Sequence, residues 1–394
     1  MAVRIELRRD AGKVDPAGGP WVRREQVGRV LGPPDPNAIA ELVDHRGKTL
    51  GFGLYSPEST IVLRLLGFGD QRPSEDWLTQ RIERALASRA ALGLGPQTTG
   101  YREINSEGDG LPGLVVDRFG EVRVAQITTA PMAARRETIL AALREVPGLI
   151  VVAPESAAAR EGFGAGVERF GEAADAPQLR WREHGLELSA PSPAGQGSFQ
   201  KTGGYHDQRD NRARFAALVG GASLPGQVLD LGTHVGGFAL AAARAGREVV
   251  ALDQSRELLG YVERNAEANA LRVTTLAADM FGELDARELS GPFAALVFDP
   301  PKVANNRREL PRALAAMGRS LTRLLPRVVE GGFVVVCSCS HHLDGEQLDR
   351  LMLELAGRCG AWTRVAGWGP GMDHPVWPGH REGEYLRVRV YQRR

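Results

Sequence analysis

The second half of this chain alternates short apolar runs with longer amphipathic segments, and this alternation limits the fold more than any other feature. Apolar runs of about five residues predict strands, and the segments between them show the 3.6-residue period of helices. The predicted strands are 227–231, 248–252, 273–277, 294–298 and 333–337, and the predicted helices are 237–245, 256–268, 307–329 and 345–357. Such alternation is typical of an α/β fold with a doubly wound parallel sheet.

The final apolar run, from Tyr385 to Tyr391, has a different pattern. Leu386, Val388 and Val390 alternate with arginines. This period of two predicts a half-exposed antiparallel strand at the edge of the sheet.

The first half of the chain predicts two smaller domains. Alternating runs broken by Gly and Pro clusters indicate a β domain at 1–75. We expect an α+β domain over 76–190, and the sheet domain over 191–394. The elements expected within 76–190 are a helix at 76–93, hairpin strands at 113–117 and 122–126, a helix at 133–145, strands near 149–153 and 179–188, and an irregular surface segment at 154–177.

Composition narrows the class of protein. The 394 residues include 49 Lys and Arg against 48 Asp and Glu, so a nucleic-acid partner would have to bind a local patch. Three Cys cannot form a disulfide framework, and their spacing matches no zinc site. The N-terminus lacks an apolar signal-peptide core, and no run approaches 18 apolar residues. We therefore expect a soluble cytoplasmic protein without a metal and without membrane contact.

A glycine-containing turn follows the first strand of the sheet domain, in the sequence VLDLGTHVGGFAL at 228–240. Glycine lets the backbone approach a ligand closely, and the helix that begins at Gly236 and Gly237 offers free N–H donors. The segment does not match G-x-G-x-x-G, the pattern that binds pyrophosphate. A dehydrogenase is therefore only a distant alternative.

Acidic residues end the first three strands of this domain, at Asp230, Asp253 and Asp279. Asp253 is placed to accept hydrogen bonds from ribose hydroxyls. Asp279 could accept from an adenine amino group, with Met280 and Phe281 packing on the ring. Adenosine contacts without phosphate contacts indicate S-adenosylmethionine. A generic glycine-rich turn with capping aspartates is the alternative.

The fourth strand ends in Asp299-Pro300-Pro301-Lys302. Consecutive prolines fix φ and remove N–H donors, so the turn is stiff and its carbonyls point in set directions. Such a turn can hold a planar base, with Asp299 hydrogen-bonded to the base edge and the next three residues contacting the substrate. An ordinary proline-terminated strand would look the same.

The fifth strand ends in Cys337-Ser338-Cys339-Ser340. A lone Cys at a strand end is more often a small buried hydrophobic residue than a nucleophile. Cys339, however, falls after the last strand residue, at the edge where parallel sheets bind ligands. Polar neighbours there could lower the pKa of a thiol. Cys339 is therefore a candidate nucleophile.

The segment GSFQKTGGYHDQRDNR at 197–212 is dense in polar residues just before the sheet domain. A solvated linker is the simplest interpretation. The alternative is a lid over a cofactor carboxylate, formed by Gln200, Lys201, Thr202 and Arg209.

With these motifs assembled, the chain resembles the RlmI-like bacterial 23S rRNA cytosine-5 methyltransferases, nearly end to end. GPWV at 19–22 resembles the opening of that family's N-terminal PUA domain, and SEGDGLPGLVVDRFG at 106–120 resembles its middle domain. QKTGGYHDQRDNR at 200–212 is similar to its signature segment, and DPPK, CSCS and DHPV at 373–376 complete the series. The chain has GTHV at 232–235, where many family members have Phe-Ser-Tyr-Thr.

The resemblance implies a function and a site. Asp230, Gly232, Gly236, Asp253 and Asp279 would hold S-adenosylmethionine. Cys339 would be the nucleophile, because the family's Ser-Cys-Ser aligns with 338–340. Ribosomal RNA of the large subunit would be the substrate, gripped in part by the β domain, and the protein would form a homodimer.

The expected chemistry is covalent catalysis at carbon 5 of cytosine. Carbon 5 is a weak nucleophile until a thiolate adds at carbon 6. Asp299 would bind the base edge at ring nitrogen 3, and the base would be flipped out or single-stranded. Two alternatives stay open: an N-methyltransferase on an rRNA purine, which needs no thiol, and a non-catalytic RNA-binding factor in ribosome assembly.

Overall fold

The computed structural model describes residues 3–193, 202–284, 287–304 and 306–394. Gln200 and Lys201 therefore lie outside the described residues. The chain folds into two compact units, each assembled from separate stretches of sequence. The first contains Met1–Leu179, Pro191–His206 and Met372–Gly383, and the second contains Arg180–Ala190, Asp207–Gly371 and Glu384–Arg394. Within the described residues, no helix is both long enough and apolar enough to span a bilayer.

The N-terminal part of the first unit is a six-stranded β domain, as predicted. Its strands are β1 (Arg4–Leu7), β2 (Trp21–Arg23), β3 (Val27–Leu31), β4 (Ile39–Val43), β5 (Thr49–Tyr55) and β6 (Ile61–Phe68), in the order β2-β6-β5-β4-β1-β3. The alternating runs place Ile5, Leu42 and Leu63 on a common inner face, where none of them is exposed. Burial of this one face accounts for the period of two in the sequence.

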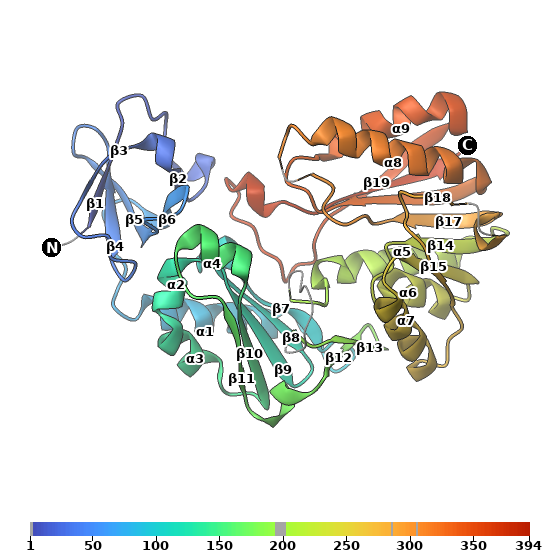
Figure 1. The fold of residues 1–394 in the computed structure, drawn as a ribbon, viewed down its shortest axis with the longest axis horizontal. Helices are drawn as coiled ribbons and strands as arrows, with labels where there is room; N and C mark the ends of the chain where they lie inside the picture. The colour runs from blue at the N-terminus through green and yellow to red at the C-terminus, as the bar shows by residue number, and fades with distance from the viewer. Residues whose placement is uncertain (1–2, 194–201, 285–286, 305) are drawn as a thin grey trace. The chain divides into compact units, whose positions relative to one another are not determined.

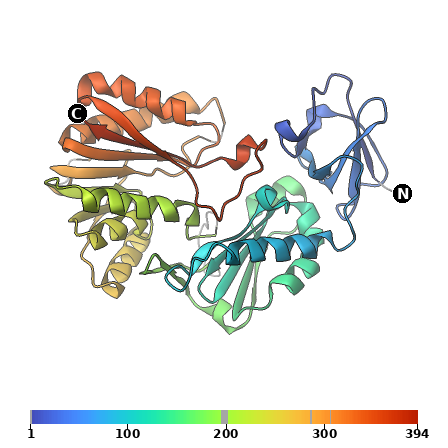
Figure 2. The ribbon, with the colours of Figure 1, turned by 180° about the vertical axis from the view of Figure 1, so that it is seen from behind.

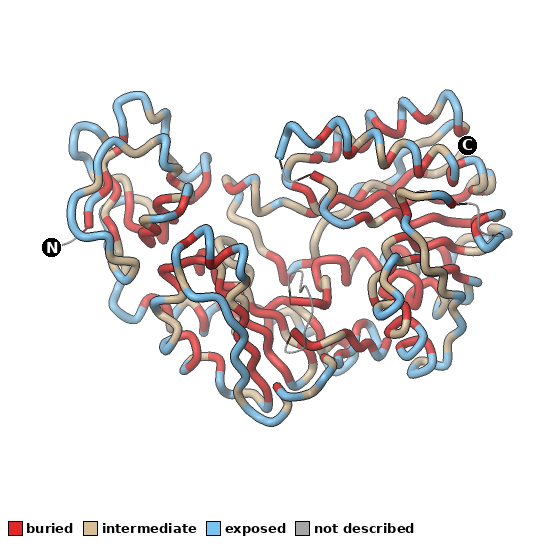
Figure 3. Tube along the Cα trace, in the orientation of Figure 1, coloured by how far each residue is buried: buried red, intermediate tan, exposed pale blue. Residues whose placement is uncertain are grey.

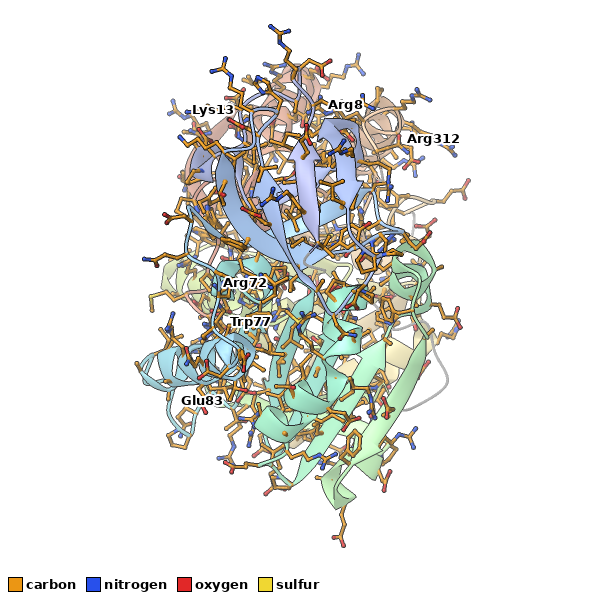
Figure 4. All side chains as sticks on the ribbon, turned by 90° about the vertical axis from the view of Figure 1, so that its left-hand side faces the viewer. Arg8, Lys13, Arg72, Trp77, Glu83 and Arg312 are labelled. Carbon is orange, nitrogen blue, oxygen red and sulfur yellow. The ribbon has the colours of Figure 1, made fainter. Side chains whose placement is uncertain are left out.

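A five-stranded sheet forms the α+β part of the same unit. Its strands run in the order β11-β10-β9-β8-β7. They are β7 (Gly100–Asn105), β8 (Leu114–Phe119), β9 (Val122–Ile127), β10 (Gly148–Ala153) and β11 (Gly166–Phe170), and the helices are α1 (Trp77–Ala90), α2 (Ala130–Ala134), α3 (Arg136–Leu143) and α4 (Glu155–Glu161). Helices α1 and α3 share one core with the sheet, and α1 crosses in front of it in Figure 2. Trp77, labelled in Figure 4, begins α1 and lies under the guanidinium groups of Arg81 and Arg135.

Two predictions for this region were wrong. Residues 154–177 are not irregular, because they contain α4 and the edge strand β11. The segment 179–188 does not join the five-stranded sheet. It forms a separate hairpin of β12 (Gln178–Glu183) and β13 (Leu186–Pro191), most of which belongs to the second unit. Asn265 accepts the Ser189 N–H there at 2.8 Å, and Arg212 donates to Glu183 at 2.7 Å.

The second unit is built on the predicted doubly wound sheet, in the order β16-β15-β14-β17-β18-β20-β19. Its strands are β14 (Gln227–Leu231), β15 (Val249–Asp253), β16 (Thr274–Ala277), β17 (Phe293–Phe298), β18 (Val328–Ser338), β19 (Trp362–Trp368) and β20 (Arg387–Arg393). Its helices are α5 (Arg209–Gly221), α6 (Gly237–Arg244), α7 (Arg256–Ala268), α8 (Leu310–Leu324) and α9 (Gly345–Cys359). Figure 1 shows α8 and α9 on one face and α5, α6 and α7 on the other.

Both faces of this sheet are buried, which explains the continuous apolar runs of its central strands. Successive residues point to opposite faces. Leu229, Leu296 and Val334 therefore pack under α8 and α9, whereas their neighbours Val228 and Val297 pack under α5 to α7. The central strands are buried along almost their whole length in Figure 3.

The last strand, β20, is antiparallel as predicted but is not at the edge. It lies between β18 and β19, because the strand 362–368 pairs with its outer side. That strand escaped the sequence prediction since it has no continuous buried face and several of its residues are exposed. Exposure removes the apolar alternation by which half-buried strands are recognised.

The packing predicts the cost of a cavity in the central sheet. Leu296 on β17 is completely buried between β14 and β18. Leu296→Ala should lower the free energy of unfolding by about 3 kcal/mol, from lost burial and the cavity left behind. The measurement is urea unfolding followed by circular dichroism. Leu353→Ala on α9 is the control: its side chain is 72% exposed, and a change of under about 0.5 kcal/mol is expected. Equal effects of the two changes would contradict this account of the core.

Candidate active site

The predicted functional residues of the second unit gather at the carboxyl edge of its sheet. Strand β14 pairs in parallel with β15 on one side and β17 on the other, and Leu231 is opposite Leu252 and Phe298. Strand β18 continues the row, with Val336 opposite Phe298. The chain winds outward in opposite directions from β14 and β17, and ligands of doubly wound sheets bind at this switch point.

The turn after β14 lies against the turn after β17. Gly232 has φ +80°, and a Cβ at this position would overlap the carbonyl oxygen of Asp299 and come within 2.8 Å of Met280 Cε. The Gly232 N–H donates to Leu252 at 2.9 Å, and the Asp299 N–H donates to Leu231 at 3.1 Å. A side chain at position 232 would therefore separate the two loops of the site.

Asp230 is a buried carboxylate at the end of β14, only 1% exposed. One oxygen, Oδ2, accepts from the Thr233 hydroxyl at 2.6 Å and from the Ala239 N–H at 3.0 Å. Among the residues that the structure describes, none donates to its other oxygen, Oδ1. Burial raises the pKa of Asp230 to about 6, although these hydrogen bonds oppose the shift. The group is a buried acceptor suited to a cationic ligand.

His234 and Asp253 join the ends of β14 and β15. The His234 N–H donates to Asp253 Oδ2 at 3.1 Å, and the Ser255 N–H donates to Oδ1 at 2.9 Å. A carboxylate has about four lone-pair sites, so these two bonds leave acceptor capacity for ribose hydroxyls. Burial, and then the charge of Arg212, lower the pKa of His234 to about 3, so its ring is neutral near pH 7.

Helix α6 begins at the two glycines predicted for the cofactor. Gly236 is its N-cap with φ +93°. A Cβ on Gly237 would overlap the guanidinium group of Arg212. Close packing of α5 on α6 therefore depends on Gly237, while Gly236 provides the left-handed backbone of the turn.

The residues after β16 form the outer part of the same edge. The exposed Asp279 accepts from the Phe281 N–H at 2.9 Å. Met280 is buried, and its carbonyl accepts from the Ser320 hydroxyl at 2.7 Å. Phe281 packs edge-on against Phe298, with ring centroids 6.1 Å apart. An apolar sulfur and an aromatic ring thus lie beside the acceptor Asp279.

The loops after β17 and β18 are joined to each other. The Ser340 hydroxyl donates to the Ala304 carbonyl at 2.9 Å. In the first loop Asp299 is partly exposed and Pro300 is buried, whereas Pro301 and Lys302 are exposed. Gln208, at the start of α5, donates from Nε2 to Asp299 Oδ2 at 3.0 Å. The sequence analysis did not predict a role for Gln208. The one signal for it was its position three residues before Asn211, within a polar segment.

The three cysteines have different surroundings. Cys337 is completely buried, and burial followed by the charge of Asp299 raises its pKa well above the usual value. Cys359 is buried at the end of α9, faces the Thr322 carbonyl and also has a raised pKa, from burial. Cys339 is partly exposed and follows the last residue of β18. Cys339 is therefore the most accessible thiol and lies at the ligand edge.

Of the four predicted lid residues, the structure describes Thr202 and Arg209, which belong to different units. Thr202 belongs to the first unit, where its hydroxyl donates to the buried Asp117. Arg209 belongs to the second unit, is 1% exposed and pairs with Asp210 at 2.8 Å. The cofactor roles of both residues stay predictions.

The residues at this edge fit S-adenosylmethionine, whose charged and aromatic parts need different neighbours. Asp230 offers a buried carboxylate oxygen to a cationic group. Asp253 offers acceptors to a ribose, and Met280 and Phe281 offer apolar surface to an adenine. The glycine turn lets a ligand approach the backbone.

Asp230 predicts how cofactor binding depends on pH. Since its pKa is near 6, protonation at pH 5 should remove most of its charge and weaken S-adenosylmethionine binding about tenfold relative to pH 7.5. The unliganded fold should respond in the opposite direction, because a raised carboxyl pKa contributes stability that is lost as pH rises through 6. Calorimetric titration at several pH values measures the affinity. Asp230→Asn should bind weakly at every pH; unchanged pH dependence in this variant would show that another group titrates.

Comparison with known proteins agrees with this arrangement. A PUA-like domain model matches residues 5–68, and a methyltransferase domain model matches residues 228–324. The structure is similar to SMU.776, a methyltransferase solved in complex with SAH, with a TM-score of 0.80, 18% identity and 100% of both chains covered. This likeness confirms the predicted fold class.

Curated relatives match over nearly the whole chain. A ribosomal RNA large subunit methyltransferase from Deinococcus radiodurans is 36% identical over 392 residues, covering 94% of this chain and 92% of that protein. Ribosomal RNA large subunit methyltransferase I from Citrobacter koseri is 31% identical over 398 residues, covering 98% of each. The chain therefore belongs to the ribosomal RNA large subunit methyltransferase I family and is an S-adenosylmethionine-dependent RNA methyltransferase.

Proposed function

We propose that this enzyme forms 5-methylcytosine in large-subunit ribosomal RNA through a covalent adduct with Cys339. The observation that carries the proposal is the position of Cys339. It follows β18, directly beside the end of β17 that bears Asp299, and it is the only one of the three cysteines that is not buried. A thiol nucleophile must reach its substrate, and Cys337 and Cys359 are enclosed in the core.

The proposed chemistry assigns roles to two side chains. The Cys339 thiolate adds to carbon 6 of cytosine, and the electron pair of the 5,6 double bond moves into the ring, which makes carbon 5 nucleophilic. S-adenosylmethionine supplies the electrophilic methyl group. Once carbon 5 carries the methyl group, a base removes its proton, the double bond reforms, and the thiolate leaves. Asp299 holds the base edge and stabilises the adduct at ring nitrogen 3.

The Asp-Pro-Pro-Lys turn suits a flat substrate. Pro300 is buried and Pro301 is exposed, so the turn is anchored on one side while the other can contact a ring. The fixed φ of each proline restricts how far the spacing between Asp299 and Lys302 can vary. A paired cytosine would have to leave its helix to reach this turn, as bases do in other enzymes that modify them.

The six-stranded β domain supplies the second part of the proposal, a grip on RNA. It carries the PUA-like match, and Arg8 and Lys13 project outward from it in Figure 4. Both side chains are exposed and could bind phosphates. The relatives are named for ribosomal RNA of the large subunit, which motivates the choice of substrate. This substrate implies a cytoplasmic enzyme; the homodimer stays a prediction.

The nucleophile can be tested by substitution. Cys339→Ser should reduce methyl transfer to large-subunit rRNA by about 1,000-fold or more, because serine is a far weaker nucleophile at neutral pH. Transfer of radiolabelled methyl groups measures the rate, and nucleoside analysis identifies the product. Wild-type enzyme should also form a denaturation-resistant complex with RNA containing 5-fluorocytidine, since carbon 5 then has no removable proton.

The matched control is Cys359→Ser, at a buried thiol that ends α9 and does not follow a strand of the sheet, which should retain activity within about twofold. Full turnover by Cys339→Ser would contradict the covalent mechanism. It would favour transfer to a nitrogen of a purine, for which an Asp-Pro-Pro turn without a thiol suffices.

A further inference from the structure

We infer that Gln208, Asn211 and Arg214 form a hydrogen-bond relay that positions Asp299 and decides which of its carboxyl oxygens carries a proton. The inference deepens the proposed function and rests on it, because it assumes that Asp299 contacts the base. Gln208 and Asn211 are positioning residues in this scheme, since they act through Asp299.

The relay runs along one side of α5. Arg214 Nη1 donates to Asn211 Oδ1 at 3.1 Å, Asn211 Nδ2 donates to Gln208 Oε1 at 2.7 Å, and Gln208 Nε2 donates to Asp299 Oδ2 at 3.0 Å. Residues three apart on a helix are neighbours, so the spacing 208, 211 and 214 aligns the three side chains. Asn211 is completely buried and Gln208 is 4% exposed, so water cannot readily replace either bond.

Arg214, at the outer end of the relay, sets the direction of its hydrogen bonds. A guanidinium group has only donors, so the Asn211 atom that faces Arg214 must be the amide oxygen. The Asn211 amide nitrogen then faces Gln208, which must present its own oxygen. Gln208 therefore presents its amide nitrogen to Asp299. An arginine at the exposed end of the relay thus makes Asp299 Oδ2 an acceptor.

A fixed acceptor at Oδ2 determines how Asp299 can act as an acid. A proton on Oδ2 would find no acceptor in the amide nitrogen of Gln208, whereas a proton on Oδ1 leaves the Gln208 bond intact. In the covalent adduct, ring nitrogen 3 of cytosine gains electron density when the thiolate adds at carbon 6. A proton that Asp299 takes up from solvent at Oδ1 is then shared with that nitrogen and returns to Oδ1 when the thiolate leaves, so the adduct is stabilised in one orientation.

Two further ionisable groups, Cys337 and Asp230, lie near the relay. Cys337 has a side-chain hydrogen bond with Gln208 and lies near Asp299, and its raised pKa keeps the thiol neutral. Asp230 acts on Cys337 from β14, and one of its oxygens, Oδ2, accepts from Thr233 and Ala239. The Gln208 amide is therefore not drawn to a second charge.

Gln208→Met tests the relay with a side chain of similar length that cannot donate. It should lower kcat about 10- to 100-fold, the effect of losing a hydrogen bond to a charged group, while the Kd of S-adenosylmethionine stays within about threefold. Asn211→Asp should also lower kcat, because an Asp can accept from Arg214 but cannot donate to Gln208. Gln227→Met is the matched control: Gln227 donates to the Glu288 carbonyl at the opposite end of β14, and activity within about twofold is expected.

Gln208→Glu gives a readout that a merely structural role would not change. Its carboxylate would repel Asp299 at pH 8, whereas one proton shared between the two groups would restore a donor to Oδ2 at lower pH. The activity of Gln208→Glu relative to wild type should therefore rise as pH falls from 8 to 6, and the relative activity of Gln208→Met should stay flat. Two flat ratios, or a loss confined to S-adenosylmethionine affinity, would overturn the relay.

Asp299→Ala distinguishes a failure of the relay from a failure of the proposed function on which it rests. An inactive Asp299→Ala enzyme together with a fully active Gln208→Met enzyme would reject the relay and leave the proposed function standing. Full activity of Asp299→Ala would reject the base contact itself. Circular dichroism of each variant verifies that it is folded.

Discussion

The parallel pairing of β14 with β17 is the constraint on which the rest of the site depends. Because the chain winds outward in both directions from this pair, the ends of β14, β15, β17 and β18 meet at one edge. Asp230 and Asp299 come from the two paired strands, and Gly232 allows their following loops to touch. The residues predicted to bind the cofactor and those proposed to bind the base are thereby held on a single rigid element, as preorganised sites require.

Placing several carboxylates at one apolar edge has an electrostatic consequence. Asp230 is buried, and its pKa rises because the ionised form loses its hydration. Donors hold each carboxylate in place: a hydroxyl and a helix N–H for Asp230, backbone N–H groups for Asp253, and the Gln208 amide for Asp299. Each donor also fixes the orientation of the carboxylate that it binds. The bonds to Oδ2 of the buried Asp230 thus determine which of its oxygens has no donor among the described residues.

The first unit combines two apolar cores with several buried ion pairs. Arg64 pairs with Glu161 at 2.7 Å and links the six-stranded domain to α4, and both side chains are almost fully buried. Arg102 pairs with Asp117, whose pKa is lowered by Arg102 and by nearby histidines although burial acts in the opposite direction. Thr202 also donates to Asp117, and Asp373 accepts from the Arg102 backbone N–H at 2.8 Å. Two segments distant in sequence thus contact one buried ion pair, Arg102 with Asp117. Removal of either partner of this pair would strongly destabilise the fold.

The sequence by itself determined the elements of the central sheet and the residues at their ends. Apolar runs such as 294–298 are continuous because both faces of the sheet are buried, and the polar residues that follow them must lie at the ligand edge. The tertiary structure decided which strands pair and which side chains meet. It placed β20 inside the sheet, because β19 pairs with its outer side, and β19 is exposed and carries no apolar pattern that would predict it. It also docked β12 and β13 within the second unit through side-chain hydrogen bonds. It also brought Gln208 to Asp299, 91 residues away. Such polar contacts leave no periodic signal in a sequence, because hydrophobic burial repeats with the backbone period, whereas a hydrogen bond depends on where two distant side chains meet.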